Sequence, residues 1–189
     1  YIANENHSQA KLALFRGETT VCNQMFRFFS NNTIAWMKNN ILFKIQTGVF
    51  GGLLLALIAL LSKFFDQPLI IGSFGASIFL LLVAPASPFS HPKNLILGHL
   101  VTTLLSFLCF LCLGDSFWSL PASMGASIVA MQLLNISHPP AAANPIIVQL
   151  AMPDHSLFLI PILIGPLLLC ISAMAFHKML TGCKYPTSN

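Results

Sequence analysis

Residues 95–114 read LILGHLVTTLLSFLCFLCLG, which is a run of twenty residues without a charged side chain. About 20 apolar residues form a helix long enough to cross the hydrocarbon core of a bilayer. The whole chain has this character, because only 7% of its 189 residues are charged and 56% are hydrophobic. A soluble domain usually carries roughly 25% charged residues. The composition therefore excludes a soluble globule and a disordered chain, and it indicates an integral membrane protein.

The charged residues are concentrated near the start of the chain. Seven of the fourteen (nine Lys or Arg and five Asp or Glu) lie within residues 1–44. The basic residues form no clustered face, so we expect no nucleic-acid partner. Within residues 25–37, aromatic residues alternate with Arg27 and Asn, as in a helix that lies in the membrane interface. We expect a cytoplasmic or interfacial segment over 1–44, a transmembrane domain over 45–178 and a short tail over 179–189.

Apolar segments within and around this domain predict an all-α, polytopic transmembrane helix bundle. We expect about six membrane segments, at residues 45–62, 69–86, 95–114, 120–136, 139–152 and 157–176. The segment 139–152 would be about 21 Å long as a helix, against a core of about 30 Å, so it either crosses as a short helix or re-enters. If it crosses, eight of the nine basic residues lie on one side and only Lys63 on the other. This bias favours six crossings with both termini in the cytoplasm.

An internal repeat relates two parts of the domain. Residues 73–100 placed over 123–150, at a constant offset of 50, give nine identities in 28 positions. Coincidence among residues common in membranes is the alternative. If the repeat is real, corresponding segments lie two crossings apart and run in the same direction. We therefore expect a parallel repeat of two helix pairs, about 69–114 and 120–152, and binding sites commonly lie between such repeats.

Each repeat contains a small-residue motif, SFGAS at 73–77 and SMGAS at 123–127. Small residues allow close helix packing, which is one interpretation. The other starts from Pro68 and Gly72, which discourage helix before Ser73, so that a helix N-terminus with free N–H groups would point into the membrane. Two such ends would bind an anion without a fixed cation. The candidate anion-binding residues are Ser73, Gly75, Ala76, Ser77, Ser123, Gly125, Ala126 and Ser127.

A second motif, SHPPAAANP at 137–145, follows the second small-residue motif. Proline suits the first position of a helix, so we expect His138 at or just before a helix N-terminus. There it either caps the helix or, because histidine titrates near neutrality, takes part in a proton-linked step. A shorter echo, SHPKN, occupies 90–94, and a further histidine lies at membrane depth, where it usually faces the bundle interior. The candidate motif or gating residues are His138, Pro139, Pro140, Asn144, His91, Asn94 and His99.

The expected crossings contain no acidic residue, and the chain lacks the common nucleotide, hydrolase and zinc motifs. We therefore expect no enzyme activity, catalytic residue, cofactor or metal. Cys109 and Cys112 form a C-x-x-C inside an apolar run. We interpret them as small helix residues, because nothing nearby would lower a thiol pKa.

These motifs together resemble a known family. SFGAS at 73–77, APASP at 84–88, HPKN at 91–94 and HPPAAANP at 138–145 occur in the order found in the HPP family of small integral membrane proteins. The resemblance implies four membrane helices and, from plant chloroplast members, nitrite transport. The chain departs from the usual pattern at His91, where glutamine is common, and at Ala142, where glycine is common.

The motifs and the resemblance lead to two functional hypotheses. The first is a transporter or channel for a small inorganic anion, nitrite first, with the paired helix N-termini as its site. The alternative is a non-transporting membrane scaffold or regulator whose repeat serves packing. We expect a bacterial inner membrane as the host, or a chloroplast envelope for a plant protein. About 134 membrane residues (45–178) are few to enclose a pathway, so a homo-oligomer stays open.

Overall fold

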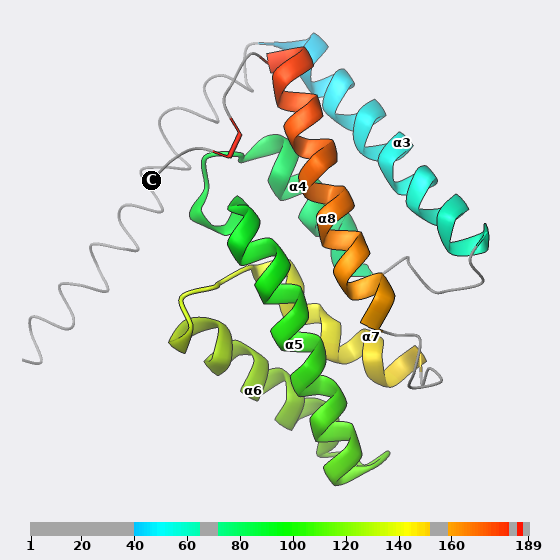
Figure 1. Ribbon diagram of the computed structural model, residues 1–189, viewed down its shortest axis with the longest axis vertical. Coiled ribbons are helices and arrows are strands. Elements are labelled where there is room, and N and C mark those ends of the chain that lie inside the picture. Colours follow the sequence, from blue (N-terminus) through cyan, green and yellow to red (C-terminus); the bar gives the residue numbers. More distant parts are fainter. Residues whose placement is uncertain (1–39, 65–71, 152–158, 182–184, 187–189) are drawn as a thin grey trace, which may run out of the picture. The chain divides into compact units, whose positions relative to one another are not determined.

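A computed structural model describes residues 40–64, 72–151, 159–181 and 185–186 (Figure 1). The chain divides into two units, 1–44 and 45–189, and nearly all described residues belong to the second. The predicted interfacial helix at 25–37 lies outside the described residues. The regular structure that is described is all helical, which confirms the all-α part of the predicted fold class. Its α-helices are α3 (Ile41–Phe64), α4 (Gly72–Val83), α5 (Pro92–Leu113), α6 (Ser119–Leu133), α7 (Asn144–Ala151) and α8 (Leu159–Phe176).

Three shorter elements complete the helical structure. Two 3-10 helices, η2 (Pro88–Ser90) and η3 (Pro139–Ala143), each precede a longer helix, and a π-helical turn, η4 (His177–Thr181), follows α8. The order α4–η2–α5 is thus followed by the similar order α6–η3–α7. From α4 to α8 the chain reverses direction between successive helices, with α7 lying obliquely (Figure 1).

Three helices in the described part of the chain are long and apolar enough to cross a membrane. They lie at residues 41–63, 92–113 and 162–180, and α4 is a shorter apolar helix. Five of the expected segments had the length of a spanning helix, and the family resemblance implies four. Two of the five expected helices are shorter than a membrane span. These are α4 and α6, which have 12 and 15 residues and therefore lengths of about 18 and 22 Å.

Local residue chemistry explains why these two helices end early. Helix α4 stops at Val83, two residues before Pro85, and a proline disfavours helical geometry in the residue before it. Helix α6 stops at Leu133, and Asn135 then adopts a left-handed conformation with φ of 52°. Asparagine tolerates this conformation, which is common just after a helix. The expectation of full-length helices over 69–86 and 120–136 is therefore wrong for the residues described.

Helix α5 is the central element of the second unit, since it packs against α6, α7, α8 and η3. Gly98 permits this packing, because a Cβ there would lie 2.9 Å from the Cβ of His138. Helix α4 packs against α8 and η3. On α8, a side chain at Gly165 would overlap the ring of Phe74. Two glycines thus bring the helices close enough to bury the residues between them.

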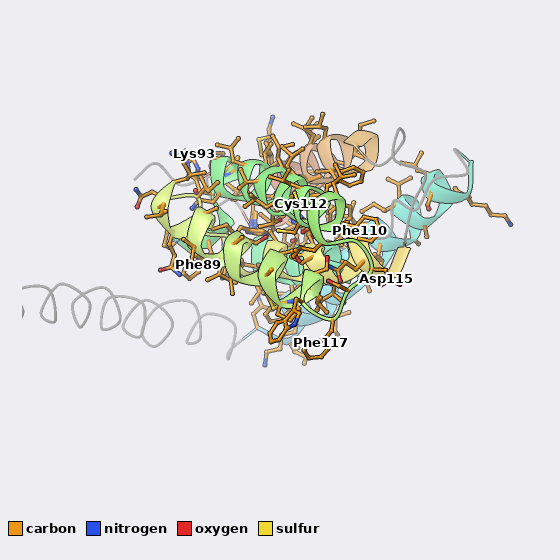
Figure 2. All side chains as sticks on the ribbon, turned by 90° about the horizontal axis from the view of Figure 1, so that it is seen from below. Phe89, Lys93, Phe110, Cys112, Asp115 and Phe117 are labelled. Atoms are coloured by element: carbon orange, nitrogen blue, oxygen red, sulfur yellow. The ribbon has the colours of Figure 1, made fainter. Side chains whose placement is uncertain are left out.

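Charged side chains mark the two ends of α5. Lys93 lies in its first turn, Asp115 lies two residues beyond its last residue, and the side chains of both, labelled in Figure 2, are exposed. Large hydrophobic side chains are exposed between them, including Leu104, Leu108 and Leu111. An apolar exposed surface with charges at its ends is the pattern of a helix in contact with lipid.

Candidate functional site

A cluster of buried polar side chains lies where α4, α5 and η3 meet. Its members come from different elements, and none is more than 2% exposed. In contrast, every Lys, Arg, Asp or Glu with a described side chain is exposed. The site is therefore polar but carries no fixed charge. We call it the central polar cluster, and it consists of Ser73, Ser77, His99, Thr102, Thr103, His138 and Asn144.

His138 is the residue that precedes η3, and its side chain belongs to the cluster. Its extended backbone, with φ of −132°, makes it the N-cap of that helix, which confirms the prediction of a helix start. Its side chain makes no capping hydrogen bond. Instead, Nδ1 lies 2.7 Å from the carbonyl oxygen of Phe89. Since a carbonyl only accepts, Nδ1 carries the hydrogen.

The other nitrogen of His138 is consequently an acceptor. Burial lowers the pKa of His138 to about 4, although the bond to Phe89 opposes the shift. At neutral pH the ring is therefore uncharged, with a lone pair on Nε2. This nitrogen lies 2.9 Å from the hydroxyl oxygen of Ser77.

Asn144 organises the opposite side of the cluster. Its Oδ1 accepts a hydrogen bond of 2.8 Å from the hydroxyl of Ser73. Its Nδ2 lies 3.2 Å from the carbonyl oxygen of His99, which can only accept, so the amide orientation is fixed. The hydroxyl oxygens of Thr102 and Thr103 also lie 3.0 Å from Nδ2, whose two hydrogens are shared among the acceptors around it. One amide thus links α4 and α5 to the start of α7.

The amide of Asn144 also determines which nitrogen of His99 carries hydrogen. Nδ1 of His99 lies 3.1 Å from Nδ2 of Asn144 and must accept from it. In the neutral ring Nε2 then carries the hydrogen. This nitrogen lies 3.2 Å from Oγ of Ser77 and donates to it.

Ser77 therefore stands between two histidines with opposite hydrogen-bonding roles. It accepts from Nε2 of His99 and can donate to Nε2 of His138. A second acceptor for its hydroxyl is the carbonyl oxygen of Ser73, at 2.9 Å. Within the described residues, every buried side-chain nitrogen and oxygen atom has a hydrogen-bond partner. The arrangement forms a continuous path of hydrogen bonds from Asn144 to Phe89, with the Ser77 hydroxyl at its centre.

The structure divides the residues of the first small-residue motif. Ser73 and Ser77 belong to the central polar cluster, whereas Gly75 and Ala76 are exposed. A Cβ at Gly75 would meet nothing within 4 Å. The described part of α4 begins at Gly72, so Ser73 lies in its first turn.

The second motif lies in a different setting. Because α6 begins at Ser119, the motif is inside the helix, and the expectation of a helix N-terminus there is wrong. Pro121 in the first turn of α6 is the sequence signal for this earlier start. Ser123 bonds to the carbonyl of Leu120, and Ser127 reaches the carbonyl of Thr102 at 3.4 Å. Gly125 is exposed and Ala126 half-buried.

The two proline-containing motifs also differ. Pro139 and Pro140 begin η3, and Asn144 belongs to the cluster together with His138. In the echo, His91 caps α5 by accepting from the backbone N–H of Lys93 at 3.2 Å. Asn94 donates to the carbonyl of Pro88 at 2.8 Å, outside the cluster. Sequence reasoning could not separate these roles, because each motif reads serine, histidine and proline.

Two contacts near η2 were not predicted. Nε2 of His177 lies 2.8 Å from the carbonyl oxygen of Leu81, and the hydroxyl of Tyr185 donates to the carbonyl of Ser90 at 2.7 Å. Burial raises the pKa of Tyr185. Nothing in the local sequence signals these contacts, since Tyr185 lies 95 residues beyond its partner.

The membrane-length helices and the buried uncharged cluster define an integral membrane protein. Residues 37–186 match the HPP transmembrane-region family, and the chain belongs to this family. A transmembrane protein of Dictyostelium discoideum is 28% identical over 129 residues, covering 64% of this chain and 45% of that protein. A second transmembrane protein of this organism is 26% identical over 125 residues, covering 62% and 40%. The chain thus spans less than half of these relatives, and no solved structure matches it.

Proposed function

We propose that this protein carries a small inorganic anion, nitrite first, across its membrane, and that the central polar cluster is the anion site. The supporting observation is the meeting of Ser77, His99 and His138 inside a bundle of membrane helices. Buried histidines are costly in a membrane protein and usually mark a functional pathway. On this proposal the protein is not an enzyme and needs no cofactor.

The absence of fixed charge suits a transported ligand. A buried anion must be hydrogen-bonded, and hydroxyl, amide and imidazole N–H groups supply donors. A lysine or arginine would hold an anion more tightly, but a transported ion must also leave its site. Donors without a fixed cation therefore favour passage over retention.

This proposal places the anion site at one small-residue motif and not between two. Ser73 and Ser77 supply hydroxyls next to His99, His138 and Asn144. The second motif serves helix packing, because Ser123 and Ser127 bond to backbone carbonyls. Gly75, Ala76, Gly125 and Ala126 lie outside the cluster and take no part in binding.

We also propose six crossings, built on a parallel repeat, with both termini in the cytoplasm. Support comes from the alternating helix directions and from the similar orders α4–η2–α5 and α6–η3–α7 (Figure 1). Helices α4 and α6 end at Val83 and Leu133, which are 50 residues apart, the offset of the sequence repeat. The short helices would cross a locally thinned bilayer or cross within a homo-oligomer. A bacterial inner membrane is the proposed host, or a chloroplast envelope for a plant protein.

A scaffold without transport activity is the second candidate. The specific observation in its favour is that every described buried polar side chain is already satisfied. Such a network can serve packing alone, by fixing how α4, α5 and α7 pack together. On this alternative the cluster stabilises the fold and no ion enters it.

Nitrite uptake into proteoliposomes separates the two candidates. We expect protein-dependent uptake above that of protein-free vesicles, and a loss of about tenfold in Ser77→Ala, which removes the hydroxyl between the histidines. Ser127→Ala is the matched control, since this buried serine lies at the equivalent motif position without a histidine contact. Both variants are measured well below their unfolding temperatures. Folded wild-type protein without nitrite uptake would exclude the transport proposal and favour the scaffold.

A further inference from the structure

The central polar cluster has a property that packing alone does not require: it can hold one additional proton without losing a hydrogen bond. In the neutral state, Nε2 of His99 donates to Ser77, and Ser77 can donate to Nε2 of His138. A proton that binds the lone pair on Nε2 of His138 turns this nitrogen into a donor. In the hydrogen bond between Ser77 and His138, Nε2 of His138 must then donate and Oγ of Ser77 must accept.

Ser77 can become the acceptor in this bond, because its hydroxyl hydrogen can rotate away from His138. The carbonyl oxygen of Ser73 lies 2.9 Å from Oγ of Ser77 and becomes the acceptor. The two lone pairs of Oγ then accept from His99 and His138, at 3.2 and 2.9 Å. Nδ1 of His138 keeps its bond to the carbonyl of Phe89. No covalent bond breaks in this step, and the sole addition is the proton on Nε2.

Electrostatics couple this proton to the anion. An isolated charge of either sign is costly in a buried site, because desolvation is not repaid. Among the described residues, the titratable groups that face each other in this cluster are the rings of His99 and His138, as the serines, threonines and Asn144 around them do not titrate. The charged side chains described (Lys44, Lys63, Lys93, Asp115 and Lys178) are all exposed. In the described part of the chain an entering anion therefore lacks a counter-charge unless a proton arrives with it.

We infer that the Ser77–His99–His138 group is a proton-binding site, and that this protein moves one proton together with each anion. The inference rests on the proposed transport function and names its coupling ion. His138 is the proton acceptor, Ser77 the switchable hydrogen-bond partner, and the imidazolium the counter-charge of the anion. By linkage, the anion raises the proton affinity of the site by the factor by which the proton raises anion affinity.

Proteoliposomes that contain a pH-sensitive dye test the coupling with nitrite as the probe. After subtraction of protein-free vesicles, we expect uptake to acidify the lumen by one proton per anion and to be independent of an imposed membrane potential. Uptake that follows the potential without acidification would overturn the coupling and leave the transport proposal intact. Absence of uptake by folded protein would overturn the transport proposal and the coupling together.

Variants of two histidines locate the proton. We expect His138→Gln to reduce coupled uptake about tenfold or more, because the lone pair and its partner bonds are lost. His91→Gln, at the partly exposed histidine of the SHPKN echo, is the matched control and should stay within about twofold. Coupled uptake that survives in folded His138→Gln protein would overturn the assignment.

A spectroscopic measurement keeps the inference testable should His138→Gln fail to fold. In ¹⁵N-histidine-labelled wild-type protein, nitrite added at mildly acidic pH should convert Nε2 of His138 from an unprotonated to a protonated nitrogen. Nδ1 of His99 should remain unprotonated throughout, because Asn144 donates to it. Protonation of a different histidine, or of none while nitrite is bound, would refute the site.

Discussion

The two halves of the proposed repeat differ most where their sequences agree best. Ser77 and Ser127 end identical G-A-S motifs and are both fully buried, yet only Ser77 meets histidines. Ser77 faces two imidazole rings, whereas Ser127 faces a backbone carbonyl of α5. The same small-residue motif thus supports a polar site in α4 and helix packing in α6.

The proline-containing motifs show the reverse asymmetry. In the first half His91 is partly exposed and caps α5, and in the second half His138 is buried and bonds to Ser77. The first half contributes Ser73, Ser77 and His99 to the cluster, and the second contributes His138 and Asn144. The two similar sequences therefore contribute different residues to one asymmetric cluster.

The largest effect should come from the pair Asn144 and Asn94, which occupy equivalent positions. We expect Asn144→Ala to lower the free energy of unfolding by about 3 kcal/mol or more, since it leaves buried partners on α4 and α5 unsatisfied. Asn94→Ala removes a single bond to Pro88 near the surface and should cost about 1 kcal/mol or less. Unfolding of the two variants in detergent measures the difference. Equal losses would contradict the asymmetry between the halves.

A smaller but more specific difference is expected between Ser77 and Ser127. Ser77→Ala leaves Nε2–H of His99 and the Nε2 lone pair of His138 without a partner, which should cost about 2 kcal/mol. Ser127→Ala loses only a bond of 3.4 Å and should cost less than about 1 kcal/mol. Chemical denaturation at neutral pH compares them. A larger loss in Ser127→Ala would show that the second motif, and not the first, carries the sensitive contacts.

The pH dependence of stability should distinguish His138 from His91. Because burial lowers the pKa of His138 to about 4 from an ordinary 6.5, the unfolded chain binds a proton between these values and the folded chain does not. Stability is therefore full above pH 6.5 and falls as the pH drops toward 4. At pH 5 the loss from this residue should be about 2 kcal/mol.

Two variants test the origin of this pH dependence. Thermal unfolding between pH 5 and pH 7.5 should show the loss in the wild-type protein and in His91→Gln. The same scan of His138→Gln should be flatter by about 2 kcal/mol. An unchanged slope in His138→Gln would assign the acid sensitivity to another group.

Local rules predicted the parts of this molecule that depend on neighbouring residues. The helix start at His138 followed from the proline after it, and the helical fold followed from long uncharged runs. The helix lengths were overestimated, because an apolar run continues through the turn at Pro85 and the left-handed Asn135 without a change in hydropathy. Composition predicts which segments lie in lipid, whereas the length of a helix depends on the backbone conformation of the individual residues at its ends.

The central polar cluster depends on contacts that no local rule provides. Ser77 and His138 are 61 residues apart, and Asn144 reaches Ser73 across 71 residues. Sequence reasoning selected all four residues as candidates, but it paired Ser77 with the second G-A-S motif instead of His138. The repeat suggested symmetry, and packing of α5 against η3 through Gly98 gave the asymmetric arrangement.

The smallest effect is expected at Gly75 and Gly125, where the two halves should behave alike. Both glycines lie within helices, are exposed, and would place a Cβ in open space. Gly75→Ala and Gly125→Ala should therefore change stability by less than about 1 kcal/mol, with a tendency to stabilise, because alanine favours helix over glycine. Nitrite uptake should remain at the wild-type level in both, as neither touches the cluster.

Parallel measurement of stability and uptake makes this last pair informative. Equal, small responses would confine the difference between the halves to the buried side of α4 and α6, where Ser77 and Ser127 lie. A loss of uptake in Gly75→Ala alone, with normal stability, would contradict this and extend the site to the outer face of α4. Close packing of a second copy requires small residues on such a face, so the oligomeric state of Gly75→Ala in detergent should be measured beside its uptake. If the oligomeric state of Gly75→Ala changed, the loss of uptake would be explained and the proposed anion site would stay at the central polar cluster.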